Sequence, residues 1–384
     1  MRLFFPRETD PSENRVMITP EVVAKLVKNG AEIGVESGLG SSLGWGDERY
    51  RLAGATLFAS RSEGLETAGA IFRFRKPSSA DLANIKAGTL HVSFLDPFND
   101  QSGVETLAKA GIRAVSLEMI PRTTLAQKMD VLSSQANLAG YVSVLLAANH
   151  LPKILPMMMT AAGTLTPSKV LIVGAGVAGL QAIATARRLG AKVSAYDTRP
   201  VVEEQVKSLG AAFVKIDIGE TGQTSGGYAK ALDENQLARQ REALKKVCAE
   251  SDVVITTAQV FGRKAPVIIT KEILSAMKPG SVVVDGAVES GGNVEGAAAG
   301  QTTLAGGVTV VALPALPGRV PVHASQVLAG NIQAFIEHSW DKESKSIRLR
   351  LDDEIIRGCL LTLDGEICHP DIRSRYGLPA LKTT

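Results

Sequence analysis

The sequence predicts an α/β protein with two domains, each built around a parallel β-sheet. Short apolar segments alternate with helical segments along most of the chain, which is typical of strand–helix–strand units. Ala, Val and Gly are abundant, whereas only 4% of the residues are aromatic, a balance that suits buried parallel strands under closely packed helices. The length of 384 residues exceeds what one hydrophobic core usually organises, and therefore favours two domains.

The composition excludes several classes of protein. Hydrophobic residues make up 45% of the chain and charged residues 21%, which argues against disorder. The net charge is only +3 and no basic arm is present, so we expect no nucleic-acid partner. Three scattered cysteines indicate free thiols in a reducing cytoplasm, and no histidine spacing predicts a metal site. Apolar runs such as 154–162 are shorter than the roughly 20 residues needed to span a bilayer.

The first domain begins with a strand at 2–5. A helix is expected to follow from Thr19 and Pro20, because threonine caps helices and proline suits the first helical position. That helix ends at Asn29-Gly30, and a strand follows at 31–36. Further strands are expected near 69–74, 88–94 and 112–116, and none is followed by a glycine-rich turn.

A polar loop at 121–130 and an apolar helix at about 132–150 follow, the helix serving as a strut between domains. The strands of the second domain are expected at 169–173, 192–196, 212–216, 252–256, 281–284 and 308–313. A last helix after His323 and strands at 346–351 and 355–363 are expected to return to the first domain. The predicted domains are therefore 1–132 with 324–384, and 133–323.

The segment KVLIVGAGVAGLQAIATARRLG places a strand, a glycine turn and a helix in order. Gly174 permits the tight turn, Gly176 lets the backbone approach a pyrophosphate, and Gly179 lets helix and strand pack closely. Val177 and Ala178 open the helix, whose free N–H groups and positive dipole favour phosphate. The second domain is therefore expected to be a doubly wound sheet that binds a dinucleotide, and the whole protein to be two Rossmann-like domains with a deep interdomain cleft.

Asp197 ends the next strand, eighteen residues beyond Gly179, where a carboxylate accepts hydrogen bonds from the adenosine ribose. It also repels a 2′-phosphate, which favours NAD(H) over NADP(H). Thr198 and Arg199 are expected beside it, and Arg199 leaves open the alternative that a 2′-phosphate is held here. The glycine-rich stretch 219–230 is expected to be a mobile loop.

The segment from Pro121 to Tyr141 is similar to one family in particular. It resembles the NAD(H)-binding component of proton-translocating nicotinamide nucleotide transhydrogenase, and the likeness covers essentially the whole chain. Other similar segments are MTAAGTLTPSKVLIVGAGVAGLQAIATARRLGA, SGGYAK, ITTA, KPGSVVVD and LPGRVP. The wider superfamily includes alanine dehydrogenase, which shares the two-domain plan, Arg15 and Lys76.

The resemblance implies a Si/Re-specific, proton-translocating transhydrogenase. In this family, hydride passes directly between NADH on this component and NADP⁺ on a separate component docked over the cleft. A membrane component, here expected on another polypeptide, couples that step to proton movement. The chain is then a homodimer in the cytoplasm, peripheral to the inner (cytoplasmic) membrane. The resemblance also assigns individual residues: Arg122, Asp130 and Ser133 to the nicotinamide carboxamide, Gln127 to a position between the two nucleotides, Tyr228 to the closing loop, and Ala258 to the cofactor.

Other interpretations remain open for several residues. Asp130 and Ser133 lie where helix caps would lie, Tyr141 is expected in the core, Asp285 suits a turn cap, and Lys76 suits a solvated loop. The sequence departs from many family members at Gly286-Ala287 and Asn293-Val294, after the strand that ends at Asp285.

Two alternative functions remain open. An alanine-dehydrogenase-type enzyme needs a proton donor beside its substrate, yet the corresponding position falls near Phe94, which cannot donate a proton. His91 is expected to face the opposite side of that strand. A non-catalytic NAD-sensing subunit is the second alternative.

Overall fold

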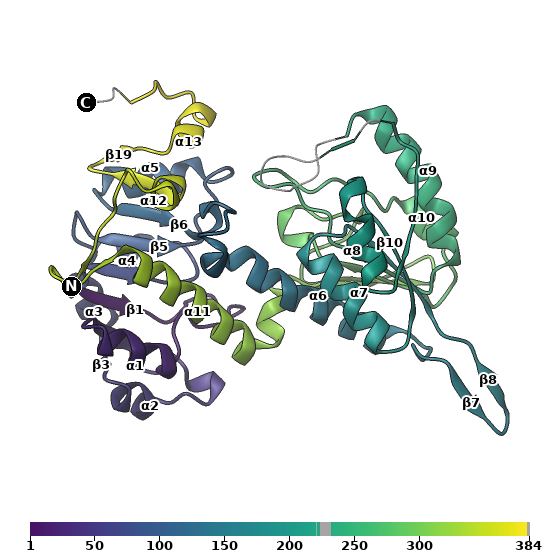
Figure 1. The fold of residues 1–384 in the computed structure, drawn as a ribbon, viewed down its shortest axis with the longest axis horizontal. Helices are drawn as coiled ribbons and strands as arrows, with labels where there is room; N and C mark the ends of the chain where they lie inside the picture. Colours follow the sequence, from purple (N-terminus) through teal and green to yellow (C-terminus); the bar gives the residue numbers. More distant parts are fainter. Residues whose placement is uncertain (220, 223–231, 382–384) are drawn as a thin grey trace. The chain divides into compact units, whose positions relative to one another are not determined.

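The computed structural model of the chain describes residues 1–219, 221–222 and 232–381. It divides into two compact units, one of Met1–Gln135 with Pro321–Thr384 and the other of Ala136–Val320 (Figure 1). We call them unit 1 and unit 2. The predicted boundaries lay after residue 132 and before residue 324. Each unit is built around a mainly parallel sheet, which confirms the predicted α/β class.

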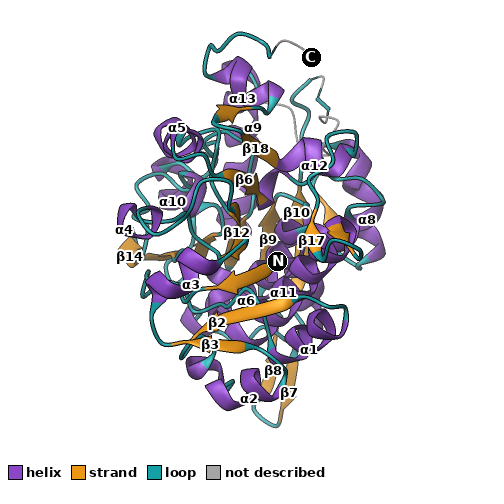
Figure 2. Cartoon of the chain, turned by 90° about the vertical axis from the view of Figure 1, so that its left-hand side faces the viewer, coloured by secondary structure: helices purple, strands orange, loops and turns teal. Residues whose placement is uncertain are grey.

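Unit 1 contains an eight-stranded sheet in the order β19-β18-β6-β5-β4-β1-β2-β3. In Figure 2, β18, β6, β2 and β3 of this sheet follow one another from top to bottom. The run β3-β2-β1-β4-β5-β6 is parallel throughout, and β18 and β19 add an antiparallel edge. The return of the C-terminal segment to this sheet is as predicted. The strands are β1 (Arg2–Phe5), β2 (Glu32–Glu36), β3 (Thr56–Phe58), β4 (Ala70–Phe72), β5 (Leu90–Ser93), β6 (Arg113–Ser116), β18 (Leu360–Leu363) and β19 (Glu366–Ile367).

Helices cover both faces of this sheet, because successive strand residues point to opposite sides. Leu3 and Phe5 belong to one buried cluster with the apolar sides of α1 and α11, whereas Phe4 belongs to another with α3 and α5. Thr19 caps α1 by accepting from Val22 N, as predicted. The helices are α1 (Pro20–Lys28), α2 (Asp47–Leu52), α3 (Arg61–Thr67), α4 (Ser79–Leu82), α5 (Gln101–Lys109), α11 (Pro321–Ser339), α12 (Glu354–Cys359) and α13 (Pro370–Arg375).

Unit 2 contains a seven-stranded sheet in the order β11-β10-β9-β12-β13-β15-β14. All neighbouring strands are parallel except β14, which pairs antiparallel with β15. The strand order reverses between β9 and β12, where ligands bind in doubly wound sheets. The strands are β9 (Lys169–Val173), β10 (Lys192–Tyr196), β11 (Ala212–Phe213), β12 (Val253–Thr256), β13 (Val282–Asp285), β14 (Gln301–Ala305) and β15 (Val308–Ala312).

Two apolar layers flank this sheet, one with α6 and α7 and the other with α9 and α10. The helices are α6 (Val131–His150), α7 (Val177–Arg188), α8 (Glu203–Ser208), α9 (Glu234–Glu250) and α10 (Lys271–Ala276). Among the described helices, α6 alone is long and apolar enough to cross a membrane, a candidate that was not predicted from the sequence. This is weak evidence for a span, since helices in the core of soluble proteins can be equally long and apolar, and Val144 and Ala147 are buried against the sheet.

The structure differs locally from the elements expected from the sequence. Residues expected as one strand at 355–363 form α12 followed by β18, because Asp353 caps a helix by accepting from Ile355 N and Ile356 N. The strand expected at 346–351 is only β17 (Ser346–Ile347), paired with β16 (Trp340–Asp341). An antiparallel hairpin of β7 (Met158–Thr160) and β8 (Gly163–Leu165), which was not predicted, extends from unit 2 in Figure 1.

Candidate functional site

A glycine turn joins β9 to α7 in unit 2. Gly174 has φ +98°, a conformation that favours glycine, and a Cβ there would lie 2.9 Å from Thr257 Oγ1. A Cβ on Gly179 would overlap the carbonyl oxygen of Gly174, so only glycine lets α7 start this close to the strand. Gly176 differs, because a Cβ there would meet nothing within 4 Å. The turn therefore has no room for a side chain at Gly174 and Gly179, whereas it has open space at Gly176.

The amino end of α7 is the second feature of this turn. Gly176 is its N-cap and no side chain caps it, so the first N–H groups of the helix have no side-chain acceptor from the cap. Val177 and Ala178, at the first two helical positions, are half-buried. A helix start of this kind favours an anion. Gly140 on α6, which was not predicted to take part, supports this start, because a Cβ there would overlap the carbonyl oxygen of Ala178.

Asp197 follows β10, and both oxygens of its carboxylate accept hydrogen bonds. Its Oδ2 accepts from Ala175 N at 2.7 Å and from Arg199 Nη2 at 2.8 Å. Its Oδ1 accepts from Arg199 N at 2.8 Å and from Arg199 Nε at 2.9 Å. The hydrogen bond to Asp197 raises the pKa of the Arg199 guanidinium above its ordinary value. Thr198, between them, is half-buried.

The carboxyl end of β12 lies beside the glycine turn, and a buried asparagine fixes its backbone. Asn293 Oδ1 accepts from Ala258 N at 3.1 Å, and Asn293 Nδ2 donates to Ala258 O at 2.9 Å and to Pro266 O at 2.8 Å. Both backbone groups of Ala258 are therefore hydrogen-bonded to Asn293. From the sequence, Asn293 stood out only as a departure from the family.

Asp285 supports the same loop. It is fully buried, and its carboxylate accepts from the backbone N–H groups of Ala287, Asn293 and Val294. The structure therefore shows the turn-capping role expected for Asp285.

The residues assigned to the carboxamide form a hydrogen-bonded cluster at the start of α6, in unit 1. Ser133 donates through its N–H to Asp130 Oδ1 at 2.8 Å and through its hydroxyl to Asp130 Oδ2 at 2.7 Å. Arg122 Nη2 donates to Ser133 Oγ at 3.0 Å, and Arg122 Nε lies 3.5 Å from Asp130 Oδ2. Asp130 therefore caps the helix and also orders the other two side chains. Gln127, in a 3₁₀ turn at Gln127–Met129, is exposed.

Arg15, one of the residues shared with alanine dehydrogenase, is buried and engaged within the chain. Glu13 binds its Nε at 2.6 Å and its Nη2 at 2.7 Å, Gln135 accepts from its Nη1 at 2.9 Å, and its guanidinium lies 3.8 Å from the centre of the Phe74 ring. The guanidinium charge is thus already compensated by Glu13.

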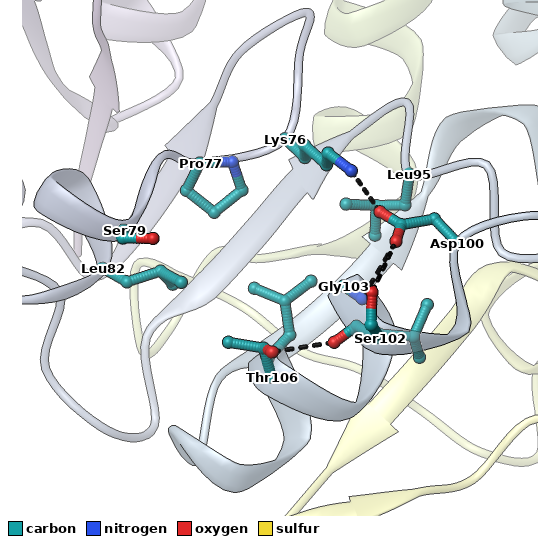
Figure 3. Close-up of a pocket in the computed structure, with 11 residues that line it drawn as sticks. Lys76, Pro77, Ser79, Leu82, Leu95, Asp100, Ser102, Gly103 and Thr106 are labelled. Atoms are coloured by element: carbon teal, nitrogen blue, oxygen red, sulfur yellow. Dashed lines mark hydrogen bonds and ion pairs between the residues drawn. The ribbon is translucent and has the colours of Figure 1, made fainter.

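Lys76, the second shared residue, pairs with Asp100 beside a cavity of about 180 Å³ (Figure 3). The cavity is lined by residues of α4, α5 and the loops before them, and none of the predicted site residues contributes to it. The lysine is therefore an ion-paired loop residue, close to the solvated role expected for it.

The position where a dehydrogenase of this superfamily would carry its proton donor offers none. The Phe94 ring packs on Phe74 with 4.6 Å between ring centroids. His91 is completely buried, and burial lowers its pKa to about 3, so it is neutral at physiological pH. These observations disfavour the alanine-dehydrogenase alternative.

Two further expectations concern tyrosines. Tyr141, expected in the core, is 38% exposed, so that expectation was wrong. The reason lies in α6, whose apolar residues are not gathered on one side, so its sequence does not reveal the buried face. Tyr228 and most of the 219–230 loop lie outside the described residues.

Comparisons with known proteins agree with this geometry. The models of the N-terminal and C-terminal domains of alanine dehydrogenase/PNT match residues 4–139 and 143–370. An NAD(P) transhydrogenase alpha subunit chain of Rhodospirillum rubrum is 43% identical over 96% of this chain and 98% of that protein. A transhydrogenase structure from Sinorhizobium meliloti is 41% identical, with a TM-score of 0.84 over 97% of this chain and 100% of that one. An alanine dehydrogenase of Halomonas elongata is 27% identical over 98% of this chain and 97% of that protein. The chain therefore belongs to the alanine dehydrogenase/PNT family and is a homologue of the alpha subunits of NAD(P) transhydrogenase.

Proposed function

We propose that the chain is the NAD(H)-binding subunit of a proton-translocating NAD(P) transhydrogenase. In this proposal, NADH bound to unit 2 passes hydride directly to NADP⁺ on a partner component, and a membrane component couples the transfer to proton movement. The observation that carries it is the open space at Gly176, between an uncapped helix start and the Asp197 carboxylate, in a chain 43% identical to a transhydrogenase alpha subunit.

The residues of unit 2 are proposed to bind the adenosine half of the dinucleotide. The first N–H groups of α7, at Val177 and Ala178, point their donors at the pyrophosphate, and Gly176 leaves room for it. Asp197 accepts from the ribose hydroxyls and repels a 2′-phosphate, so NADH should bind more tightly than NADPH. Equilibrium titration of nicotinamide fluorescence checks this order, and equal affinities would contradict it.

The residues at the start of α6 are proposed to orient the nicotinamide. A carboxamide needs a donor for its oxygen and an acceptor for its NH₂, and Arg122, Ser133 and Asp130 together offer both. Bound NADH supplies the hydride, so the chain need supply no general acid or base. Its residues bind the ring, fix its orientation and exclude water.

Reconstitution tests the activity. The purified chain mixed with the NADP-binding component of a transhydrogenase should transfer hydride from NADH to NADP⁺, whereas either protein alone should not. A non-catalytic NAD-sensing subunit would bind NADH yet give no transfer in the mixture. Oxidation of alanine by the isolated chain would instead support the dehydrogenase alternative.

Gln127 is proposed to lie between the two nucleotides, and Gln127→Asn tests this. Shortening the exposed side chain by one methylene withdraws its amide, and a misplacement of about 1 Å costs on the order of a hundredfold in rate. NADH affinity should change little, because the adenosine contacts come from unit 2. Stopped-flow single turnovers beside a thermal melt separate this role from a structural one. A normal rate with a lowered melting temperature would remove Gln127 from the site.

The partner proposals concern assembly. We propose a homodimer, supported by exposed apolar side chains in and just before the β7–β8 hairpin, Met157, Met158, Met159 and Leu165, which a monomer would leave in water. Analytical ultracentrifugation showing a monomer at micromolar concentration would contradict it. We also propose a cytoplasmic location, peripheral to the inner membrane through the partner components. Co-sedimentation with membranes that carry those components, and not with bare lipid vesicles, checks that location.

A further inference from the structure

Asp197 has no acceptor position left for a ribose hydroxyl. A carboxylate offers about four lone-pair positions, two on each oxygen. Here each oxygen of Asp197 already accepts two hydrogen bonds, from Ala175 N and Arg199 Nη2 on Oδ2, and from Arg199 N and Nε on Oδ1. A ligand that binds this carboxylate through hydroxyl groups must therefore displace some of these donors.

Two of the four hydrogen bonds come from backbone N–H groups and two from the Arg199 side chain. Only the side-chain donors can move away from Asp197 without a change in the backbone. The N–H groups of Ala175 and Arg199 belong to the backbone that follows β9 and β10, so they hold one oxygen each whatever the guanidinium does. The guanidinium fork of the Arg199 side chain donates the other two bonds, and the side chains of this pair are only 12% and 6% exposed. Removing the fork leaves the carboxylate oriented by the backbone.

We propose that Arg199 is a specificity-determining residue: its guanidinium competes with the ribose hydroxyls of NAD(H) for Asp197 and provides a cation for the 2′-phosphate of NADP(H). The inference rests on the proposed function, because it requires a dinucleotide at the glycine turn. In this view the pair has opposite effects on the two cofactors. Asp197 attracts the ribose of NADH and repels the phosphate of NADPH, whereas Arg199 weakens the first interaction and offsets the second.

The consequence is that the site prefers NADH over NADPH less strongly than a site with Asp197 and no neighbouring arginine would. NADH binding must break two charge-assisted hydrogen bonds before the ribose can replace them. A 2′-phosphate pairs with the same guanidinium, which partly cancels the repulsion from the Asp197 carboxylate. Arg199 thus narrows the gap between the two affinities.

Arg199→Gln tests this directly, with NADH and NADPH affinities measured by fluorescence titration. We expect NADH to bind about threefold or more tightly than to the unaltered chain, because the competing fork is gone. NADPH should bind at least tenfold more weakly, and loss of detectable NADPH binding counts as this result. Arg188→Gln on the exposed side of α7 is the matched control, since it also removes one positive charge and should change neither affinity.

A second pair of variants approaches the same question from Asp197. Asp197→Asn should raise NADPH affinity at least tenfold, since it removes the repulsion and releases the guanidinium. In the Asp197→Asn, Arg199→Gln double variant most of that gain should disappear. Thermal melts confirm that each variant folds, and Asp197→Ser replaces Asp197→Asn if the amide is not tolerated.

The possible failures are distinguishable. An Arg199→Gln variant that loses NADH affinity would show that Arg199 positions Asp197 instead of competing with the ribose, and would overturn the inference. Equal NADPH affinity in the single and double Asp197 variants would overturn it as well. If the unaltered chain binds neither NADH nor NADPH, the proposed function fails first.

Discussion

The two units have the same strand order, but they differ at the point where that order reverses. In unit 1 the parallel strands run β3-β2-β1-β4-β5-β6, and in unit 2 they run β11-β10-β9-β12-β13-β15. The order reverses between β1 and β4 in one unit and between β9 and β12 in the other. In doubly wound sheets this reversal opens the crevice where ligands bind.

The segment after the first strand differs between the units. In unit 2, β9 ends at Val173 and α7 begins at Val177, with only the glycine turn between. In unit 1, β1 ends at Phe5 and α1 does not begin until Pro20, so a long loop takes the place of the short glycine turn.

In unit 1 the residues that follow β1 and β4 bind one another at this crevice. Glu8, just after β1, accepts from Phe74 N at 2.6 Å and Arg75 N at 3.3 Å, and lies 3.9 Å from the buried Arg73. Burial raises the pKa of the Glu8 carboxyl. Strand order therefore creates the position of a site, whereas the residues after the strands decide whether it is open.

The largest effect is expected from the turn that keeps unit 2 open. Gly176→Ala adds a methyl group to space that contains no described atom within 4 Å, at an ordinary φ of −78°. The free protein should therefore keep its melting temperature, while NADH affinity should fall at least tenfold, about 1.4 kcal/mol, if that space holds the pyrophosphate. Isothermal titration and a thermal melt on the same sample measure both quantities.

Two other glycines complete this test. Gly179→Ala should lose stability and affinity together, because its methyl overlaps Gly174 O and forces α7 away. Gly330→Ala, on α11 of unit 1 with nothing within 4 Å, should leave NADH affinity unchanged. Normal NADH binding by Gly176→Ala would show that the open space does not serve the ligand.

A second effect, on stability alone, is expected from the closed crevice of unit 1. Glu8→Ala leaves the N–H groups of Phe74 and Arg75 without their acceptor and removes one carboxylate from beside Arg73. The cost should be about 1–3 kcal/mol, measured by urea unfolding, with unchanged NADH affinity. Glu8→Gln keeps one acceptor oxygen and should cost less. A loss of NADH binding in a folded Glu8→Ala protein would mean that the units do not divide their roles in this way.

A third effect separates the two sheets by their response to pH. His91 on β5 is buried and neutral, whereas β13, at the same place in the other sheet, reads Val-Val-Val-Asp with no histidine. The folded His91 has a pKa of about 3, below its ordinary 6.5, so on acidification the unfolded chain takes up this proton first. Stability from this group is present above pH 6.5 and is lost as the pH falls toward 3.

His91→Gln tests that sign. At pH 5 the loss from His91 should be roughly 2 kcal/mol, since the pH is about 1.5 units below the ordinary value. The variant should therefore lose less stability between pH 7 and pH 5 than the unaltered chain, whatever its stability at pH 7. Arg73 and Asp81 carry the charges that act on His91, and both remain in the variant. Parallel pH profiles for the two proteins would show that His91 does not respond to acid in this way.

The α/β class and the glycine turn follow from local sequence. Strand and helix periodicity, a Thr-Pro helix start and the spacing of the glycines in the turn are properties of neighbouring residues. The helix starting at Pro20 and the turn at Gly174 could therefore be predicted. The start of α6 was also predicted to within one residue, because a capping aspartate precedes it.

The contacts that close the crevice of unit 1 and shape the site of unit 2 join residues far apart in the sequence, so only the tertiary structure shows them. Glu8 meets Phe74 N sixty-six residues away, and Asn293 holds Ala258 thirty-five residues away. No local pattern encodes such pairs, because they exist only after strand order brings distant chain segments together. For the same reason the sequence determined that Asp197 and Arg199 are present, but only the fold showed that Arg199 takes two of the four acceptor positions on Asp197 with its side chain.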